Sequence, residues 1–194
     1  MNAPLVAPVS QLAHSLLQRQ NMALEMIERD EPLGDVLALL CHIVEAEARN
    51  PVRASILLVD AEAQCLRTGA APGLPDAYNR AVDGIGISSE VGTCAAAAAM
   101  GRVVVTNDIA QAASWHGIAH LPLALGLVAA WSMPIKGSDG AVLGTFGTYF
   151  TDTRDPTRDE QQLVAFLAGT AAMAIESQRA RSQRRNGAGC AAGA

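Results

Sequence analysis

The sequence lacks the features that would place it in a membrane, in a secretory pathway or on a nucleic acid. No apolar run reaches the roughly 20 residues that a membrane-spanning helix needs, and residues 1–10 lack the basic start and apolar core of a signal peptide. The net charge is −5, so we expect no basic face that would bind phosphates. These absences predict a cytoplasmic protein without a membrane or nucleic-acid partner.

Cysteines and aromatic residues are scarce. The four cysteines share no regular spacing and form no CxxC pair: Cys41, Cys65, Cys94 and Cys190. Zinc sites and disulfide frameworks are therefore not expected, and the thiols should be reduced. Only 4% of the residues are aromatic, and Trp115 and Trp131 are the only tryptophans, which makes their positions informative.

The chain is nevertheless long enough for a sizeable core. Its 194 residues are 50% hydrophobic and 17% charged, as expected for one domain with flanking segments. We divide it into a helical extension over residues 1–31, a domain over residues 32–178, and a basic helix end with a flexible tail over residues 179–194. The arginines of the last part are interpreted as a solvated helix end, where the helix dipole favours cations.

Hydrophobic periodicity and turn residues predict the order of the elements. Helices are expected at residues 11–29, 32–49, 74–82, 94–100, 120–127 and after Thr157, and strands at residues 52–60, 64–70 and 102–106. Thr157 and Glu160 have the spacing of a capping box. Residues 84–89 are expected to be irregular, and residues 187–194 to be a disordered tail.

Two β-rich runs, residues 128–135 and 141–150, are expected to close the domain as a hairpin. The Asp139-Gly140 pair in the loop between them is a strong hairpin signal. Gly144 and Gly147 lie in the second run, where glycine usually marks a bulge or a close backbone approach. Hairpins surround an interior helix without strand–helix alternation, so the predicted fold is α+β, with an antiparallel sheet and helices on its faces.

Three motifs in this order resemble the GAF family. The first is D-G-I-G at residues 83–86 with G-T-C-A at residues 92–95, which resembles a glycine-rich loop before the central helix. The second is G-R-V-V-V-T-N-D-I at residues 101–109, which resembles a strand and turn. The third is W-S-M-P-I at residues 131–135 with G-T-F at residues 144–146, which resembles the closing hairpin.

The resemblance covers about residues 33–177 and implies a central antiparallel sheet with N- and C-terminal helices forming a bundle. It also implies a function, because family members bind small ligands and usually regulate an attached output domain. We expect a stand-alone sensory domain that binds a small molecule and signals to a partner protein, with no catalytic residue. The resemblance alone identifies neither the ligand nor a cofactor.

In this fold the ligand would lie over one sheet face, under the loops 74–89 and 107–127. Free N–H groups at the start of the central helix favour anions, and tryptophans offer stacking surface and a donor. The predicted ligand-binding residues are Thr93, Cys94, Ala95, Trp115, His116, His120, Trp131 and Ser132. Thr93 has an alternative interpretation as an N-cap, and Trp131 one as a core residue.

Two other functions remain open. His116 and His120 are four residues apart, a spacing that suits a metal or haem on one helix face, although Gly117 and Pro122 disfavour a straight helix. Cys94 suggests a thiol enzyme, because some family members reduce free methionine-R-sulfoxide. No resolving thiol is evident, and a small buried residue is the alternative for Cys94.

The terminal helices suggest a homodimer. Leu12, Leu16, Met22 and Met26 form an apolar stripe at residues 11–29, and the last helix has a second stripe. The resemblance implies dimerisation through such helices. The first stripe precedes the expected domain, so we predict that it contacts a second chain and does not pack on its own sheet.

Overall fold

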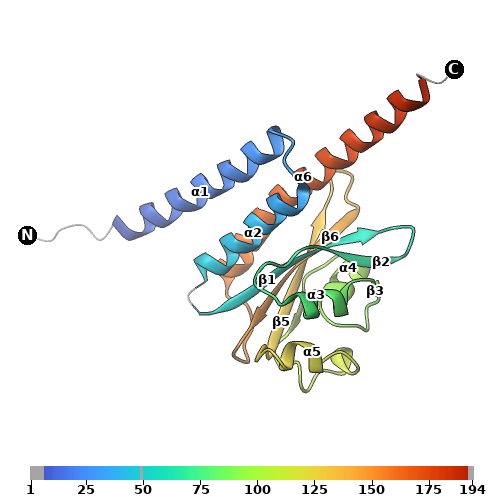
Figure 1. The fold of residues 1–194 in the computed structure, drawn as a ribbon. Helices are drawn as coiled ribbons and strands as arrows, with labels where there is room; N and C mark the ends of the chain where they lie inside the picture. The colour runs from blue at the N-terminus through green and yellow to red at the C-terminus, as the bar shows by residue number, and fades with distance from the viewer. Residues whose placement is uncertain (1–6, 49, 192–194) are drawn as a thin grey trace, which may run out of the picture.

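The computed structural model describes residues 7–48 and 50–191. One six-stranded sheet separates two groups of helices (Figure 1). Helices α1, α2 and α6 cover one face, which we call the helix-facing side, and the short helices α3, α4 and α5 with their loops cover the other, which we call the loop-facing side. Within the described residues, no helix is both long and apolar enough to cross a membrane.

The element order confirms the α+β prediction. The helices are α1 (Ala7–Glu28), α2 (Leu33–Glu47), α3 (Asp76–Val82), α4 (Cys94–Met100), α5 (His120–Leu123) and α6 (Arg158–Ala191), with a 3-10 turn η1 (Ala113–Trp115). The strands are β1 (Val52–Asp60), β2 (Cys65–Ala70), β3 (Ile85–Gly86), β4 (Val104–Thr106), β5 (Ala129–Lys136) and β6 (Val142–Phe150). Their order across the sheet is β3-β2-β1-β6-β5-β4, and all neighbouring strands are antiparallel.

The closing hairpin forms as the sequence predicts, with β5 and β6 paired antiparallel. Gly140 has a φ of +82°, which suits its place in the turn. A Cβ atom placed on Gly144 would lie 2.3 Å from the carbonyl oxygen of Leu57, and one on Gly147 would lie 2.8 Å from Sγ of Cys94. Both strand glycines therefore mark close approaches, as expected.

The capping box at the start of α6 is also confirmed. The Thr157 N–H donates to a Glu160 carboxylate oxygen at 2.8 Å, and the Glu160 N–H donates to Thr157 Oγ1 at 3.2 Å. Arg154 donates two further hydrogen bonds to the Glu160 carboxylate, at 2.8 and 2.7 Å. These contacts satisfy donors at the helix start that would otherwise lack a partner.

Three local predictions were wrong. Ile85–Gly86 is a short strand paired with β2, because backbone pairing with a distant strand overrides an irregular local sequence. Helix α5 ends at Leu123 and not at residue 127, and Gly126 in the turn that follows has a φ of +72°. The tail expected from residue 187 continues α6 to Ala191, and residues 192–194 lie outside the described residues.

Helix α1 folds back against its own domain, which corrects the prediction for its apolar stripe (Figure 1). Ala23 is fully buried, and Leu16, Met26 and Ile27 pack against the core between the helices and the sheet. The side chain of Leu12 lies outside the described residues. Most of the described stripe is therefore buried against this chain's own helices, because α1 packs on both α2 and α6.

Candidate ligand site

Small and hydroxyl-bearing residues line the loop-facing side of the sheet. Gly147 on β6 lies between Ser55 on β1 and Ser132 on β5 in one row across the three strands. Thr145 lies two residues before Gly147 and therefore on the same face. Thr93 approaches this face from the start of α4. We call Ser55, Thr93, Ser132 and Thr145 the hydroxyl cluster, and all four are buried.

Three side chains of this region form a hydrogen-bonded chain. Ser132 Oγ donates to Thr93 Oγ1 at 2.8 Å, and Cys94 Sγ lies 3.1 Å from Ser132 Oγ. Because Ser132 has already given its only proton to Thr93, the Cys94 thiol is the donor in the second bond. The Thr93 side chain caps no helix N–H, so its interpretation as a capping hydroxyl was wrong. Its hydroxyl instead accepts the hydrogen bond from Ser132 and so links the start of α4 to β5.

The other two members of the hydroxyl cluster make no hydrogen bond of normal length. Thr145 Oγ1 is buried without a partner, and Ser55 Oγ makes no hydrogen bond of normal geometry, although it lies near the Tyr149 phenol. A buried polar group without a partner costs free energy on the order of 1–3 kcal/mol, and such groups are rare in native proteins. Buried polar groups that lack a protein partner commonly bind a ligand or an ordered water molecule. The cluster therefore has unused hydrogen-bonding capacity in an otherwise apolar interior.

Two tyrosines lie beside the hydroxyl cluster. Tyr149 is two residues after Gly147 on β6, and its ring meets that of Tyr78 from α3 edge to face, with centroids 6.1 Å apart. Burial raises the pKa of Tyr78 to about 12. Burial also raises the pKa of Tyr149, and the nearby Cys94 and Tyr78 act in the same direction, while the contact with the Ser55 hydroxyl lowers the pKa. Both phenols are therefore neutral near pH 7 and can donate hydrogen bonds.

Trp115 covers the start of α4. Its ring carbons lie 3.7 Å from where a Cβ atom of Gly92 would be. The Gly92 N–H donates to the carbonyl oxygen of Ser114 at 2.8 Å. The indole Nε1–H donates to Thr106 Oγ1 on β4 at 3.2 Å, and the side chain is buried. Trp115 therefore joins the loop over the sheet to the edge strand, close to the predicted site.

The two histidines are at the surface. His116 and His120 are both exposed, and they do not share a helix, because His120 is the first residue of α5 and Gly117 has a φ of +93°. Within the described residues, no three His, Cys, Asp or Glu side chains are grouped so that they could hold a metal ion. The two histidines therefore do not lie on one helix face.

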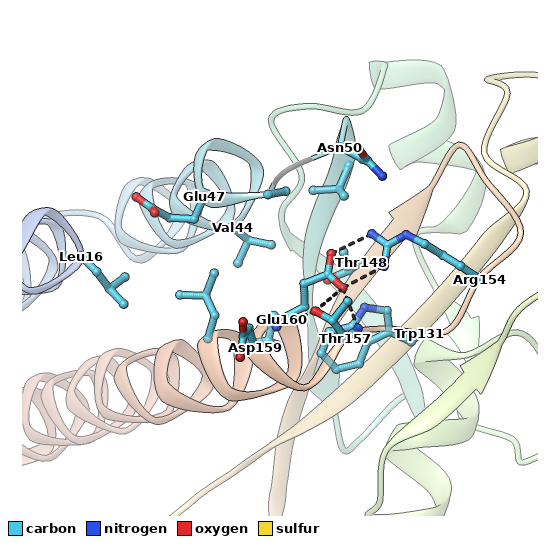
Figure 2. A pocket seen from close by; sticks show the side chains of 14 residues that line it. Leu16, Val44, Glu47, Asn50, Trp131, Thr148, Arg154, Thr157, Asp159 and Glu160 are labelled. Carbon is cyan, nitrogen blue, oxygen red and sulfur yellow. Dashed lines mark hydrogen bonds and ion pairs between the residues drawn. The ribbon is translucent and has the colours of Figure 1, made fainter. Parts of the chain in front are cut away.

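Trp131 lies on the opposite side of the sheet from Ser132. Side chains of neighbouring strand residues point to opposite faces, so the two residues cannot both face one pocket. Trp131 is fully buried in the core on the helix-facing side, and there it lines a cavity with Thr148 (Figure 2). The prediction that Trp131 and Ser132 together form the floor of one site was therefore wrong.

The structure thus brings together only part of the predicted site. Thr93, Cys94 and Ser132 are hydrogen-bonded to one another, Ala95 packs with Cys94, and Trp115 lies beside Gly92. Ser55, Thr145, Tyr78 and Tyr149 were missed. Strand alternation in T-F-G-T-Y-F at residues 145–150 places Thr145, Gly147 and Tyr149 on one face and could have suggested two of them.

The described thiols are separate from one another in the fold. Cys94 belongs to the hydrogen-bonded chain under α4, and Cys65 is buried in β2. Cys41 on α2 donates to the carbonyl oxygen of Ala70, and burial, followed by the charge of Glu45, raises the pKa of its thiol. No disulfide joins these three described cysteines. The side chain of Cys190 lies outside the described residues.

The family model described as "GAF domain" matches residues 30–176. The match covers most of the chain and includes the whole sheet with α2 to α5. The chain therefore belongs to the GAF domain family.

One relative and two solved structures illustrate this membership. The "Methyl sulfide methyltransferase-associated sensor" of Methanosarcina acetivorans is 32% identical over 177 residues, which are 90% of this chain and 18% of the relative. The chain therefore spans less than a fifth of that protein's length.

The solved structures show the same fold at low sequence identity. A domain of a two-component sensor histidine kinase protein from Sinorhizobium meliloti is 24% identical, with a TM-score of 0.64 over 80% of this chain and 98% of that one. Free methionine-R-sulfoxide reductase from Neisseria meningitidis, solved with its substrate, is 15% identical, with a TM-score of 0.68 over 93% of this chain and 98% of that one.

Proposed function

We propose that this chain is a cytoplasmic sensory domain that binds a small molecule on the loop-facing side of its sheet and signals the bound state to a partner protein. The observation that carries the proposal is the hydroxyl cluster, in which Thr145 is buried without a hydrogen-bond partner and Ser55 makes no hydrogen bond of normal geometry. Membership of the GAF family and a relative named as a sensor support the sensory role.

The surrounding side chains indicate the chemistry of the ligand. The hydroxyl cluster and the neutral Tyr149 phenol offer hydrogen bonds, while the rings of Tyr78 and Trp115 offer flat apolar surface. No charged side chain is buried among the described residues. A small, planar, polar molecule therefore fits this face better than a peptide or a nucleic acid.

Entry of such a ligand requires the cover to move. The cover over the hydroxyl cluster is made of short pieces, since α3 and α4 have seven residues each, α5 has four and η1 has three. Short segments at the edge of a domain open locally at a lower free-energy cost than its central strands, and ligand sites often use such segments as lids. The loops 74–89 and 107–127 would act together as the lid.

The route to a partner would lead through the terminal helices. Helix α6 packs along β5, the strand that carries Ser132, and continues well past the sheet (Figure 1). Leu17 and Met22 on α1, and Phe166 and Met173 on α6, are exposed apolar side chains. Such side chains favour burial in an interface. We propose that they contribute to a homodimer that transmits the ligand state.

The test of the ligand site uses a substitution that should not disturb the fold. A thermal-shift screen of small planar metabolites first identifies a ligand. Ser55→Ala then removes a buried hydroxyl that makes no hydrogen bond of normal geometry, so the unliganded protein should keep about the same stability. Its affinity for the ligand should fall by about three- to tenfold, the value of one hydrogen bond.

A matched control lies on the other side of the sheet. Thr148→Val also removes an unpartnered buried hydroxyl, but from the helix-facing side, and should leave affinity for this ligand unchanged. If Ser55→Ala binds the ligand as tightly as the parent protein, the ligand lies elsewhere. If both variants weaken it equally, the effect is not local and the placement is wrong.

Two other functions have their own tests. For a thiol enzyme, we expect no reduction of free methionine-R-sulfoxide with a thioredoxin-type reductant, because the three described cysteines are buried, lie on separate elements and form no disulfide. Turnover that is lost in Cys94→Ser would replace our proposal with the enzyme. A haem sensor using His116 or His120 would show a Soret absorption band. Loss of that band on substitution of either exposed histidine would replace our proposal with the haem sensor.

A further inference from the structure

A cavity lies on the helix-facing side of the sheet, between the end of α2 and the start of α6 (Figure 2). Its volume is about 490 Å³, within the range of ligand pockets. Its apolar lining comes from the terminal helices and from the sheet. These residues are Leu16 of α1, Val44 of α2, Val52 of β1, and Leu163 and Val164 of α6. The sheet separates this cavity from the hydroxyl cluster.

Two buried polar groups in the cavity wall have no partner. Trp131 on β5 and Thr148 on β6 are paired directly across the two strands and line the cavity together. Their exposed fractions are 0% and 2%, and neither the indole Nε1–H nor the hydroxyl makes a hydrogen bond. In an apolar wall each of these groups costs free energy unless something binds it. The pair therefore places two unpartnered hydrogen-bonding groups next to each other in the floor of the cavity.

The charges around the cavity argue against an anionic occupant. Among the described lining residues, Arg154 is the only cationic side chain, and the Glu160 carboxylate accepts two hydrogen bonds from it. Its guanidinium also lies 3.5 Å from the centre of the Phe150 ring. The Glu47 carboxylate lies 4.0 Å from a guanidinium nitrogen of Arg19, and Asp159 adds a further carboxylate to the lining. The described charges at the cavity are therefore largely paired and leave no free cation for an anionic occupant.

We propose that this cavity is a second binding site, for a small, neutral and largely apolar molecule that carries a carbonyl oxygen. The oxygen accepts a hydrogen bond from the Trp131 indole and a second one from the Thr148 hydroxyl, while the apolar body fills the space between α2 and α6. The occupant contacts α1, α2, α6 and the sheet at once, so it holds the terminal helices on the domain. The proposal does not depend on the ligand of the loop-facing side.

The experiment uses the full chain and a fluorescent probe of the required chemistry, 6-propionyl-2-(dimethylamino)naphthalene, which is neutral and has one ketone. We expect saturable binding of one probe per chain, with a blue shift of its emission. The chain has only two tryptophans, so a ¹H–¹⁵N spectrum has two indole signals. The probe should move the Trp131 signal and leave the Trp115 signal in place, with Trp115→Phe assigning the two.

Three variants locate the probe. Thr148→Val removes the cavity hydroxyl and should weaken binding by about three- to tenfold. Thr145→Val makes the same chemical change three residues earlier on β6, where the unpartnered hydroxyl faces the other side of the sheet, and should leave binding unchanged. Ala48→Phe adds a ring at the cavity wall, on an extended backbone with φ −70°, and should reduce binding by at least about tenfold.

Several results would overturn the proposal. Absence of saturable binding to the wild-type chain would exclude this class of occupant. Equal affinity in Ala48→Phe, equal weakening in Thr148→Val and Thr145→Val, or movement of the Trp115 signal in place of the Trp131 signal would place the probe elsewhere. Both threonine variants lose an unsatisfied hydroxyl, so neither should fold less stably than the parent chain, and their folding is checked by thermal melting.

Discussion

Replacing Gly147 with alanine tests how closely α4 packs on the sheet. The added Cβ would lie 2.8 Å from Sγ of Cys94 and 3.0 Å from Oγ of Ser55. Both distances are well below ordinary van der Waals contact, so at least one neighbour must move. Neither neighbour is the far end of a flexible side chain, since Cys94 starts a helix and Ser55 lies within a central strand. We therefore expect α4 to shift away from the sheet.

The size of the effect follows from two opposing contributions. Overpacking a core costs about 1–3 kcal/mol, whereas alanine in place of glycine lowers the entropy of the unfolded chain and returns about 0.4–1 kcal/mol. The Gly147→Ala protein should therefore lose about 1–2 kcal/mol of unfolding free energy. For a chain of this size, the loss corresponds to a decrease in Tm of about 2–8 °C.

Urea unfolding and thermal melting of a glycine series provide the measurement. Gly86→Ala is the matched strand control, because a Cβ atom there meets nothing within 4 Å, and it should be neutral or stabilising. Gly144→Ala should cost more than Gly147→Ala, because its Cβ would lie 2.3 Å from the backbone oxygen of Leu57.

The cause of the loss can be checked in the same series. Cys94→Ala removes the sulfur atom and should recover part of the loss when combined with Gly147→Ala, which a double-mutant cycle detects as coupling. A Gly147→Ala protein as stable as Gly86→Ala would refute the packing described here for α4.

Two further predictions concern acid stability and assembly. Burial opposes ionisation of Glu160, but the hydrogen bonds from Arg154 and the helix cap outweigh it and lower the pKa below the ordinary 4.5. The ionised carboxylate therefore stabilises the fold above that value, and this stabilisation is lost as the pH falls. Between about pH 6 and about pH 3, Tm should fall less for Glu160→Gln than for the wild-type protein. Parallel plots of Tm against pH for the two proteins would contradict this prediction. Glutamate at both exposed positions Leu17 and Met22 should give a monomer by light scattering, whereas Met100→Glu, exposed on α4, should not; an unchanged mass of the double variant would remove α1 from the proposed interface.

Signals between residues close in sequence were sufficient for much of the fold. Asp139-Gly140 predicted the turn of the closing hairpin, and Thr157 with Glu160 predicted the start of α6. Gly147 was expected to mark a close approach, and it does. The turn and the helix start depend on backbone geometry within a few residues, so the sequence alone determined them. The missing side chain at Gly147 indicated a close approach but did not identify the neighbours.

The candidate site depended on contacts that no local pattern contains. Strand alternation alone could have separated Trp131 from Ser132, but which face the terminal helices cover is decided by packing between distant elements. The same packing turned the stripe of α1, including Leu16, onto its own domain. Only the register of β1 against β6 brings Ser55 opposite Gly147, beneath Cys94. Burial and hydrogen-bond partners arise from these long-range contacts, and so only the tertiary structure decided which polar groups remain without a partner.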